Sequence, residues 1–340
     1  MTDPNLPERI GVVPEPALPQ HPDVPTWRMA TRDDIDAMHS VLLAADRVDH
    51  PTWTTPRQDV ADSFELPHID HQRDTVIGFT SEGTPVAVGS VFLHPSRDVR
   101  VQVELQGAVH PDVRRRGIGT QLVAWQHDQA LRRLAEVDSP LPGVVKAYAE
   151  GRNDDAAALF ERRGLQVERW FSTMERDLTA PADERPAPDD ITLVPYTADR
   201  ALDVLEARND AFRDHWGSLP SQREGWLKFV EGPFLRPDLS TLALDGDRVV
   251  ALCLASVNED DWDALGASHA YIDLIGVVRS HRGRGLAPAV IARSLRAAAD
   301  AGLERAVLDV DTESPTGANA LYERLGFVAT ARERALVRRY

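Results

Sequence analysis

Two short segments of the sequence place an arginine three residues before a glycine, a pattern suited to binding an anion. The motifs are R-x-x-G-x-G, with Arg114, Gly117 and Gly119, and R-x-x-G-x-A, with Arg282, Gly285 and Ala287. Glycine lets the backbone approach a ligand closely, and the unpaired N–H groups at the start of a helix attract phosphate. The sequence therefore predicts two strand-to-helix turns that each suit a pyrophosphate, although such a turn can also be purely structural.

The candidate anion sites include the residues that flank each motif. In the first copy this adds Arg115, which contributes a mobile positive charge. In the second copy the flanking residues are Val277, Val278, Gly283, Arg284 and Leu286. Neither segment is a dinucleotide-binding G-x-G-x-x-G or a G-x-x-x-x-G-K-[ST] phosphate loop, so these two nucleotide motifs are excluded here.

A second motif follows each turn farther along the chain. It reads LFERRGL at 159–165 and LYERLGF at 321–327. The copies lie 168 residues apart for the turn and 162 for this segment, a difference that a surface loop such as 139–143 absorbs. Two motifs that recur in the same order at a domain-sized period indicate tandem domains.

The hydrophobic patterns around these motifs also repeat. We expect strands at 27–31, 75–80, 85–93, 101–109 and 144–149 in the first half, and at 191–196, 240–245, 248–257, 270–278 and 305–311 in the second. We expect helices at 32–48, 122–134, 199–212 and 290–302, and short helices at the second motif. Alternating strands and helices predict an α/β class, a mixed sheet with flanking helices in each half.

Two proline-rich segments divide the chain. Residues 1–26 form an arm that we expect to be extended or disordered, because proline fixes φ and cannot donate a backbone hydrogen bond. Residues 180–190 combine prolines with acids and lack a hydrophobic period, as a linker does. We therefore expect an N-terminal domain at 27–179 and a C-terminal domain at 191–340, each large enough to bury a core.

The composition narrows the classes of partner. The net charge of −16 disfavours nucleic acid and anionic membranes and fits a cationic substrate, although an acidic surface can simply aid solubility. The single cysteine, Cys253, excludes an internal disulfide and a cysteine-rich zinc site, and we expect no metal. No apolar run approaches the roughly 20 residues of a membrane span, and the first residues do not resemble a secretory signal. We expect a cytoplasmic monomer or homodimer.

The paired motifs resemble those of the GNAT superfamily of N-acetyltransferases, and the resemblance covers both halves of the chain, as in tandem members of that superfamily. It implies two tandem GNAT-like domains. It also implies that the R-x-x-G-x-G/A turn binds the pyrophosphate of acetyl-CoA, the co-substrate. The later N-x-x-A-x-x-L-Y-x-x-x-G-F segment would lie beside the thiol, and its tyrosine often protonates the departing thiolate.

Carried over residue by residue, the resemblance places Tyr322 at the position of this general acid, the alternative being an ordinary core aromatic. The first copy has Phe160 there, which cannot donate a proton. We therefore expect the C-terminal domain to be catalytic and the N-terminal domain to be degenerate, whether or not it binds acetyl-CoA. Pro315 stands where the first copy has Asn153, so the loop before Tyr322 departs from the family pattern.

A general base must remove a proton from the acceptor amine before it attacks the acetyl carbonyl. The family often uses a carboxylate on the strand before the glycine turn, and Asp273 in YIDLIGVV is the candidate. A carboxylate in an apolar strand is unfavourable unless it is paired or functional, so a salt-bridged or edge-strand aspartate is the alternative. Glu104 is a weaker counterpart, because the alignment puts Leu105 opposite Asp273.

The segment 210–217 lies where the family builds part of the acceptor pocket. Asp214, His215 and Trp216 are candidates for binding an amine by charge, hydrogen bonding and cation–π contact. In the alternative interpretation Trp216 belongs to the core and His215 ends a helix. Cys253 stands in an apolar strand and is expected in the core rather than as a nucleophile.

The leading functional hypothesis is an acetyl-CoA-dependent N-acetyltransferase that acts on a primary amine of a small molecule by direct attack in the C-terminal domain. Two alternatives stay open. One is an acyl-CoA-binding or sensing protein without catalysis, and the other is a protein N-acetyltransferase. The sequence names neither the acceptor amine nor the oligomeric state.

Overall fold

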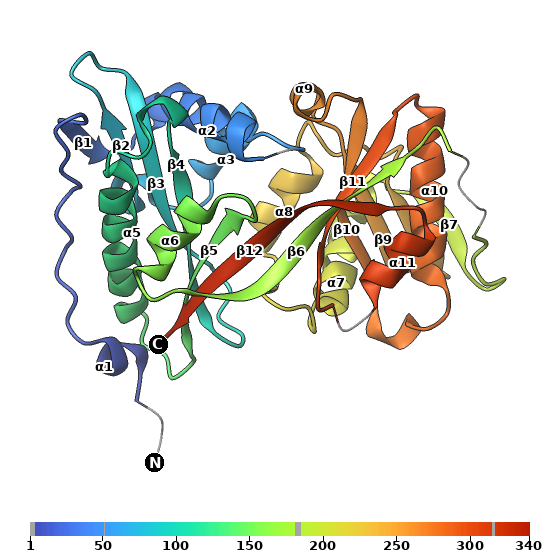
Figure 1. The fold of residues 1–340 in the computed structure, drawn as a ribbon. Coiled ribbons are helices and arrows are strands. Elements are labelled where there is room, and N and C mark those ends of the chain that lie inside the picture. Colours follow the sequence, from blue (N-terminus) through green and yellow to red (C-terminus); the bar gives the residue numbers. More distant parts are fainter. Residues whose placement is uncertain (1–3, 51, 181–184, 315–316) are drawn as a thin grey trace. The chain divides into compact units, whose positions relative to one another are not determined.

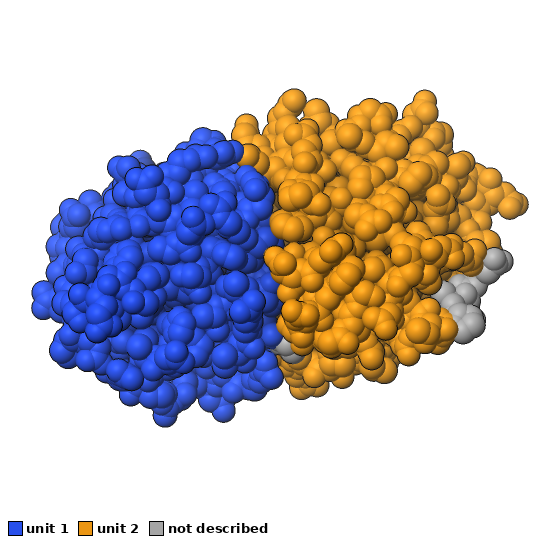
Figure 2. Space-filling model, turned by 90° about the horizontal axis from the view of Figure 1, so that it is seen from above, with its two compact units in different colours: residues 1–170, 333–340 blue, residues 171–332 orange. Residues whose placement is uncertain are grey.

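The computed structural model describes residues 4–50, 52–180, 185–314 and 317–340 (Figure 1). Contacts along the chain divide it into two compact units, coloured separately in Figure 2. Unit 1 comprises Met1–Trp170 and Glu333–Tyr340, and unit 2 comprises Phe171–Arg332. Among the described residues, no helix is long and apolar enough to cross a membrane.

Unit 1 alternates helices and strands. Its strands are β1 (Thr26–Met29), β2 (Thr75–Phe79), β3 (Pro85–Leu93), β4 (Val101–Val109) and β5 (Gly143–Glu150). Its α-helices are α1 (Leu6–Ile10), α2 (Ile35–Asp49), α3 (Arg57–Ser63), α4 (His71–Asp74), α5 (Ile118–Ala135) and α6 (Asp154–Glu161). The short 3-10 helices are η1 (Arg32–Asp34) and η2 (Pro111–Val113).

Unit 2 repeats this order. Its strands are β7 (Thr192–Pro195), β8 (Thr241–Asp245), β9 (Arg248–Ser256), β10 (His269–Val277) and β11 (Arg305–Asp311). Its α-helices are α7 (Ala201–Ala211), α8 (Arg223–Val230), α9 (Trp262–Leu265), α10 (Leu286–Asp300) and α11 (Ala318–Arg324). The 3-10 helices are η3 (Ala198–Arg200), η4 (Glu259–Asp261) and η5 (Arg279–His281).

Each unit is built on a mixed sheet, which confirms the predicted α/β class. The order is β1-β2-β3-β4-β5 in unit 1 and β11-β10-β9-β8-β7 in unit 2. Only β4 with β5 and β10 with β11 run parallel among these neighbours, and the others are antiparallel. In unit 1, α5 packs on one face of the sheet and α2 with α3 on the other, so each face has its own hydrophobic cluster.

The last strand of each sheet comes from the other half of the sequence. β6 (Gln166–Asp177) pairs with β11 through Phe171–Asp177, and β12 (Val328–Arg339) pairs with β5 through Glu333–Arg339. The chain therefore exchanges its closing strands, as the green and red strands of Figure 1 show. The boundaries between the two compact units consequently fall after Trp170 and after Arg332 in the sequence, and not within the proline-rich segment 180–190. The division into a degenerate and a catalytic domain stays a prediction about function.

The sequence predicted an extended or disordered N-terminal arm, but part of this arm is helical. Residues Leu6–Ile10 form α1, because proline is tolerated in the first turn of a helix, where its missing N–H costs nothing. Leu6 is fully buried in the core of unit 1, and its N–H donates to the carbonyl of Ser139 at 2.9 Å. In the linker, residues 181–184 lie outside the described part of the chain, as does Pro315.

The strand exchange makes a prediction about stability. Leu336 on β12 is fully buried in the unit 1 core. Replacing it by alanine should cost about 2–5 kcal/mol, the usual range for a fully buried leucine. We expect hydrogen exchange to accelerate at the amides of β4 and β5. The matched variant Leu252→Ala, in the unit 2 core, should instead accelerate exchange in β9 and β10. Faster exchange in β9 and β10 after Leu336→Ala would contradict the assignment of β12 to unit 1.

Candidate functional site

The glycine turn of unit 2 joins β10 to α10 through η5. Gly283 and Gly285 have φ of 76° and 78°, a left-handed conformation that favours glycine, and Gly285 is the N-cap of α10. A Cβ added at either glycine would meet no atom within 4 Å, so the space beside the turn is open. Val278 and Leu286 are buried on either side of the turn and anchor it in the core. The unpaired N–H groups at the start of α10, where Pro288 contributes none, thus lie beside open space, as an anion site requires.

The arginines of this turn are committed to acidic partners. Arg282 pairs with Asp214 at 3.0 Å, and Arg284 donates to Asp190 at 2.7 Å. Arg279, just before the motif, also pairs with Asp214, through Nε at 2.8 Å. From the sequence, the arginines near the turn were expected to provide mobile positive charges for binding a phosphate. Their pairing reduces the positive charge that they offer to an anion, which leaves the backbone N–H groups of the turn as the other source of attraction.

The glycine turn of unit 1 has the same backbone but different surroundings. Arg115 has φ of 66° at the position of Gly283, a conformation uncommon outside glycine, and it pairs with Asp155. Gly117, with φ of 98°, is the N-cap of α5, and a Cβ there would lie 3.8 Å from His21. The ring of His21 also hydrogen-bonds the carbonyl of Arg116 at 2.8 Å. The N-terminal arm therefore borders this turn, whereas the turn of unit 2 is open.

Close packing explains the glycine at position 119, the last residue of the first motif. A Cβ at Gly119 would lie 3.0 Å from Leu159, so a glycine lets α5 approach α6. The corresponding Ala287 in α10 is partly exposed. Arg114 donates to both carboxylate oxygens of Asp49 at 2.8 Å, at the end of α2. The first arginine of each motif is thus paired with an aspartate, which is the last residue of α2 in unit 1 and lies just beyond the end of α7 in unit 2.

The two parallel strands of each unit separate towards the glycine turn. The register of β10 and β11 ends at Tyr271 with Val307, although β10 continues to Val277. The register of β4 and β5 likewise ends at Leu105 with Ala147. Beyond these points, the facing edges of the strands are no longer joined by ladder hydrogen bonds. This separation leaves backbone groups available to an extended ligand that runs from the turn into the sheet.

A β-bulge distinguishes the two units at the strand before the turn. The register of β10 with β9 shifts between Ile272 and Leu274, so Asp273 is the extra residue. The register of β4 with β3 runs from Val109 to Val103 without a shift. Bulges re-aim a side chain and are common next to active sites. The candidate base therefore stands on an irregularity that the first copy lacks.

Asp273 accepts a hydrogen bond from the Ser256 hydroxyl at 2.7 Å, and Ser256 ends the neighbouring strand β9. In unit 1, Glu104 pairs with Lys146 at 3.0 Å and accepts from the Gln106 amide at 2.8 Å. Near the position that corresponds to Asp273, unit 1 therefore has a carboxylate that is neutralised by a lysine.

Tyr322 lies on α11 and is buried, with its ring edge-on to Phe327 at 6.0 Å between centroids. Burial raises the pKa of the Tyr322 hydroxyl above its ordinary value, and the neighbouring Cys253 thiol adds to the shift. The phenol therefore stays protonated at neutral pH, as a proton donor must. Its counterpart Phe160, on α6, packs partly buried against the unit 1 core.

Cys253 is fully buried in the core of unit 2. Burial is the main cause that raises the pKa of its thiol to about 12, while a hydrogen bond with Ser294 lowers this pKa and the charge of Asp273 raises it. The thiol is thus a neighbour of both Asp273 and Tyr322, which places all three in one region of unit 2. A protonated, buried thiol is a poor nucleophile, so Cys253 is a core residue here.

The three acceptor candidates have different environments. Asp214 is engaged by Arg279 and Arg282, and these hydrogen bonds lower the pKa of its carboxyl. Burial lowers the pKa of His215, whose ring nitrogen contacts the Trp216 carbonyl at 2.9 Å. Trp216 is half-buried, 6.0 Å from the Phe171 ring centroid. Asp214 is thus hydrogen-bonded to the arginines of the glycine turn. His215 and Trp216 have other contacts, with each other and with Phe171.

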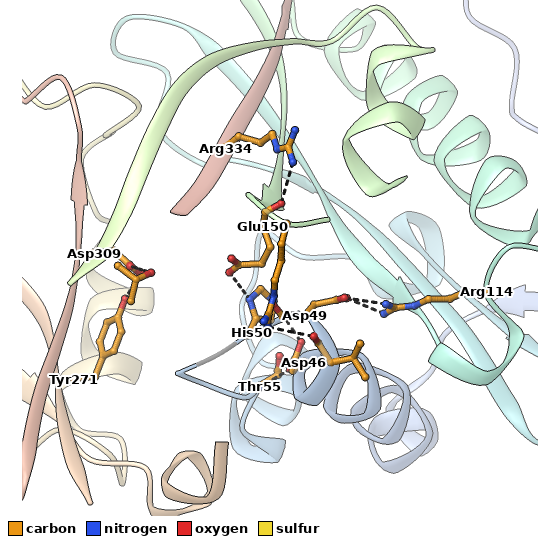
Figure 3. Close-up of polar contacts among 12 residues, drawn as sticks. Asp46, Asp49, His50, Thr55, Arg114, Glu150, Tyr271, Asp309 and Arg334 are labelled. Carbon is orange, nitrogen blue, oxygen red and sulfur yellow. Dashed lines mark hydrogen bonds and ion pairs between the residues drawn. The ribbon is translucent and has the colours of Figure 1, made fainter. Parts of the chain in front are cut away.

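A polar cluster in unit 1, shown in Figure 3, was not expected from the sequence. His50 follows α2, contacts Glu150 at 2.9 Å, lies 3.7 Å from Asp46 and stacks on Trp53 with centroids 3.9 Å apart. Arg334 donates to the Glu150 carbonyl at 3.3 Å. The dipeptide Asp-His occurs at 49–50, 70–71 and 214–215, so it did not by itself single out this cluster.

Comparison with known proteins adds to this geometry. A family model described as the acetyltransferase (GNAT) family matches residues 36–165 and 201–327, one region in each half. A curated relative named mycothiol acetyltransferase, from Salinispora tropica, is 36% identical over 231 residues, which cover 65% of this chain and 68% of the relative.

Solved structures have the same architecture. A GCN5-related N-acetyltransferase from Sphaerobacter thermophilus aligns with a TM-score of 0.68 and 25% identity, covering 92% of this chain and 95% of that one. A tandem GNAT protein from the clavulanic acid biosynthesis pathway aligns with a TM-score of 0.67 and 17% identity, covering 92% and 98%. The second likeness concerns the fold alone.

Proposed function

Because this chain belongs to the acetyltransferase (GNAT) family, we propose that unit 2 transfers the acetyl group of acetyl-CoA to a primary amine of a small molecule. The protein is a GNAT-type acetyltransferase with two family domains in tandem. What the proposal adds is the acceptor class, the active unit and the residues that act.

One observation carries the choice of unit 2. It combines a buried, protonated phenol at Tyr322, a carboxylate on a β-bulge at Asp273 and a glycine turn beside open space. Unit 1 has a glycine turn but a phenylalanine at the acid position and a regular strand before the turn. The same fold therefore occurs with and without the groups that acetyl transfer needs.

The proposed reaction is a direct transfer. The glycine turn, Val277 to Ala287, would bind the pyrophosphate through backbone N–H groups and leave the thioester in the opening between β10 and β11. Asp273, directly or through water, takes a proton from the acceptor ammonium. The amine nitrogen then attacks the acetyl carbonyl, a C–N bond forms and the C–S bond breaks as Tyr322 gives its proton to the departing thiolate. The nitrogen loses its second proton as the amide forms, and this proton restores the phenol of Tyr322.

A covalent route through the protein is disfavoured by the environment of Cys253. An acetyl-cysteine intermediate needs a thiolate, and burial raises the pKa of this thiol to about 12. We therefore propose attack by the amine without an acetylated enzyme. Unit 1 is proposed to serve as a degenerate copy that at most binds acetyl-CoA through Arg114, Arg115, Gly117 and Gly119.

An amine panel with release of the CoA thiol as readout tests this function. The panel begins with a mycothiol-related amine, because of the relative's name, and continues with polyamines and amino sugars. We expect one thiol released per amine acetylated. Binding of acetyl-CoA without thiol release for any amine would support a non-catalytic acyl-CoA-binding protein. Acetylation of proteins but of no small amine would favour a protein N-acetyltransferase.

A further inference from the structure

We propose that Asp214 is a positioning residue for the acetyl-CoA site, where it holds the glycine turn of unit 2 through Arg282 and Arg279. The sequence had made Asp214 a candidate for binding the acceptor amine. The inference rests on the proposed function for the identity of the ligand, whereas the contacts that support it belong to the protein alone.

The guanidinium of Arg282 connects three parts of unit 2. Its Nη1 donates to Asp214 at 3.0 Å, its Nη2 donates to the carbonyl of Ala211 at 2.9 Å, and its Nε donates to the carbonyl of Val277 at 3.4 Å. Ala211 ends α7 and Val277 ends β10. The side chain of Arg282 therefore connects the turn to the end of α7 and to the end of β10.

A second aspartate reinforces this connection. Asp210 accepts a hydrogen bond from the backbone N–H of Arg279 at 2.9 Å, at the first residue of η5. The side chain of Arg279 then reaches Asp214. Asp210 in the last turn of α7 and Asp214 just beyond the helix thus present two carboxylates to the segment that leads into Gly283 and Gly285. Their charges make these hydrogen bonds stronger than neutral ones.

Unit 1 supplies an independent instance of the same arrangement. Asp49 ends α2 and pairs with Arg114 through two bonds of 2.8 Å, and Arg114 also donates to the carbonyl of Val109 at 2.9 Å. Val109 ends β4, as Val277 ends β10. The link therefore accompanies the glycine turn in both units, although unit 1 lacks the bulge and the phenol. A residue that bound only the acceptor amine would not need to recur with the same arginine.

The link has a defined physical effect on binding. Asp214 neutralises the arginines, so the turn attracts a pyrophosphate mainly through backbone N–H groups whose direction depends on the backbone of Gly283 and Gly285. Glycine is the most flexible residue, and ordering such a turn on binding costs conformational entropy. A turn that is already held in place avoids part of that cost. Loss of the link should thus weaken acetyl-CoA binding and leave the chemical step alone.

The test is Asp214→Asn in the full-length protein, with Asp238→Asn as the matched control. Asp238 also pairs with an arginine of unit 2, Arg236 at 2.9 Å, outside the site. Two readouts are needed, the Kd of CoA by calorimetry and the kinetic constants for acetyl-CoA and the amine. We expect Asp214→Asn to raise the Kd of CoA and the KM of acetyl-CoA about tenfold, with kcat and the amine KM within about twofold. Asp238→Asn should leave all of them unchanged.

Three results would overturn the inference. A raised amine KM with unchanged CoA affinity would make Asp214 an acceptor contact, as the sequence first suggested. Unchanged CoA affinity and unchanged kinetics would show that the link is dispensable. Equal loss of CoA and amine affinity would indicate general unfolding. In that case Arg282→Lys, which keeps the charge but not the planar fork, should not weaken CoA binding selectively. The CoA titration needs no acceptor, so it decides the matter even if no small amine is acetylated.

Discussion

Replacing Tyr322 by phenylalanine should lower kcat by about 10²–10⁴-fold, the usual contribution of general acid catalysis. The phenol is the proton donor that we place beside the departing thiolate, and burial keeps it protonated. The substitution removes one hydroxyl from a buried ring, so the Kd of CoA should not change. Steady-state thiol release and a CoA titration measure the two quantities.

Tyr196→Phe is the matched control for this variant. Tyr196 is a second buried tyrosine of unit 2, and its hydroxyl has no hydrogen-bond partner among the described residues. Its loss should leave kcat unchanged. Full activity of Tyr322→Phe would show that the thiolate takes its proton elsewhere, and equal losses in both variants would attribute the effect to packing.

Asp273→Asn should lower kcat by about 10²–10⁴-fold at neutral pH, the range for a positioned general base. An ammonium group with an ordinary pKa near 10.4 is protonated at that pH, so the amine needs a base before it can attack. Near pH 10, where solvent deprotonates more of the amine, the difference between variant and wild type should shrink. A pH profile of kcat measures this convergence.

Glu104→Gln is the counterpart of this variant in unit 1. It should leave the kcat profile unchanged, since Glu104 is held by Lys146 in the unit without the phenol. A deficit of Asp273→Asn that stayed constant across the pH range would indicate a structural role for the carboxylate, held by Ser256. The role of the base would then pass to another group.

Much of the fold could be predicted because its strands are short apolar runs bounded by turns. The segments 85–93, 101–109 and 305–311 were expected as strands, and β3, β4 and β11 have these bounds. The repeat of the two motifs indicated two family domains, which the family model confirms. These features depend on local pattern and on internal repetition, both of which a single sequence contains.

The exchanged strands could not be predicted in the same way. No strand was expected at β6 or β12, because neither segment alternates apolar and polar residues, and a strand pattern alone would not say which sheet a strand joins. The partners of Phe171–Asp177 and Glu333–Arg339 are far away in sequence. Such pairing is decided by tertiary packing, for example by the burial of Leu336 in unit 1. Helix α1 was missed for a similar reason, because the burial of Leu6 stabilises a short helix in a proline-rich arm.

The candidate site was predictable in its residue types but not in its pairings. The glycines with positive φ, the buried phenol and the carboxylate on β10 all belong to unit 2. The partners of the arginines could not be read from spacing, since Asp214 and Arg282 come from separate elements. The dipeptide Asp-His occurs at 49–50 and 214–215 but also at 70–71, so it becomes informative only once Asp49 and Asp214 are both seen beside the first arginine of a turn.

The central claim is that acetyl transfer belongs to unit 2 although both units have a glycine turn. The most direct test exchanges the two aromatic residues at the acid position in one protein, Phe160→Tyr with Tyr322→Phe, and measures thiol release with the best amine of the panel. We predict that the exchanged protein is as inactive as Tyr322→Phe alone, because unit 1 lacks a carboxylate on a bulge. Recovery of wild-type turnover in the exchanged protein would contradict the account, since unit 1 would then need only a phenol to act.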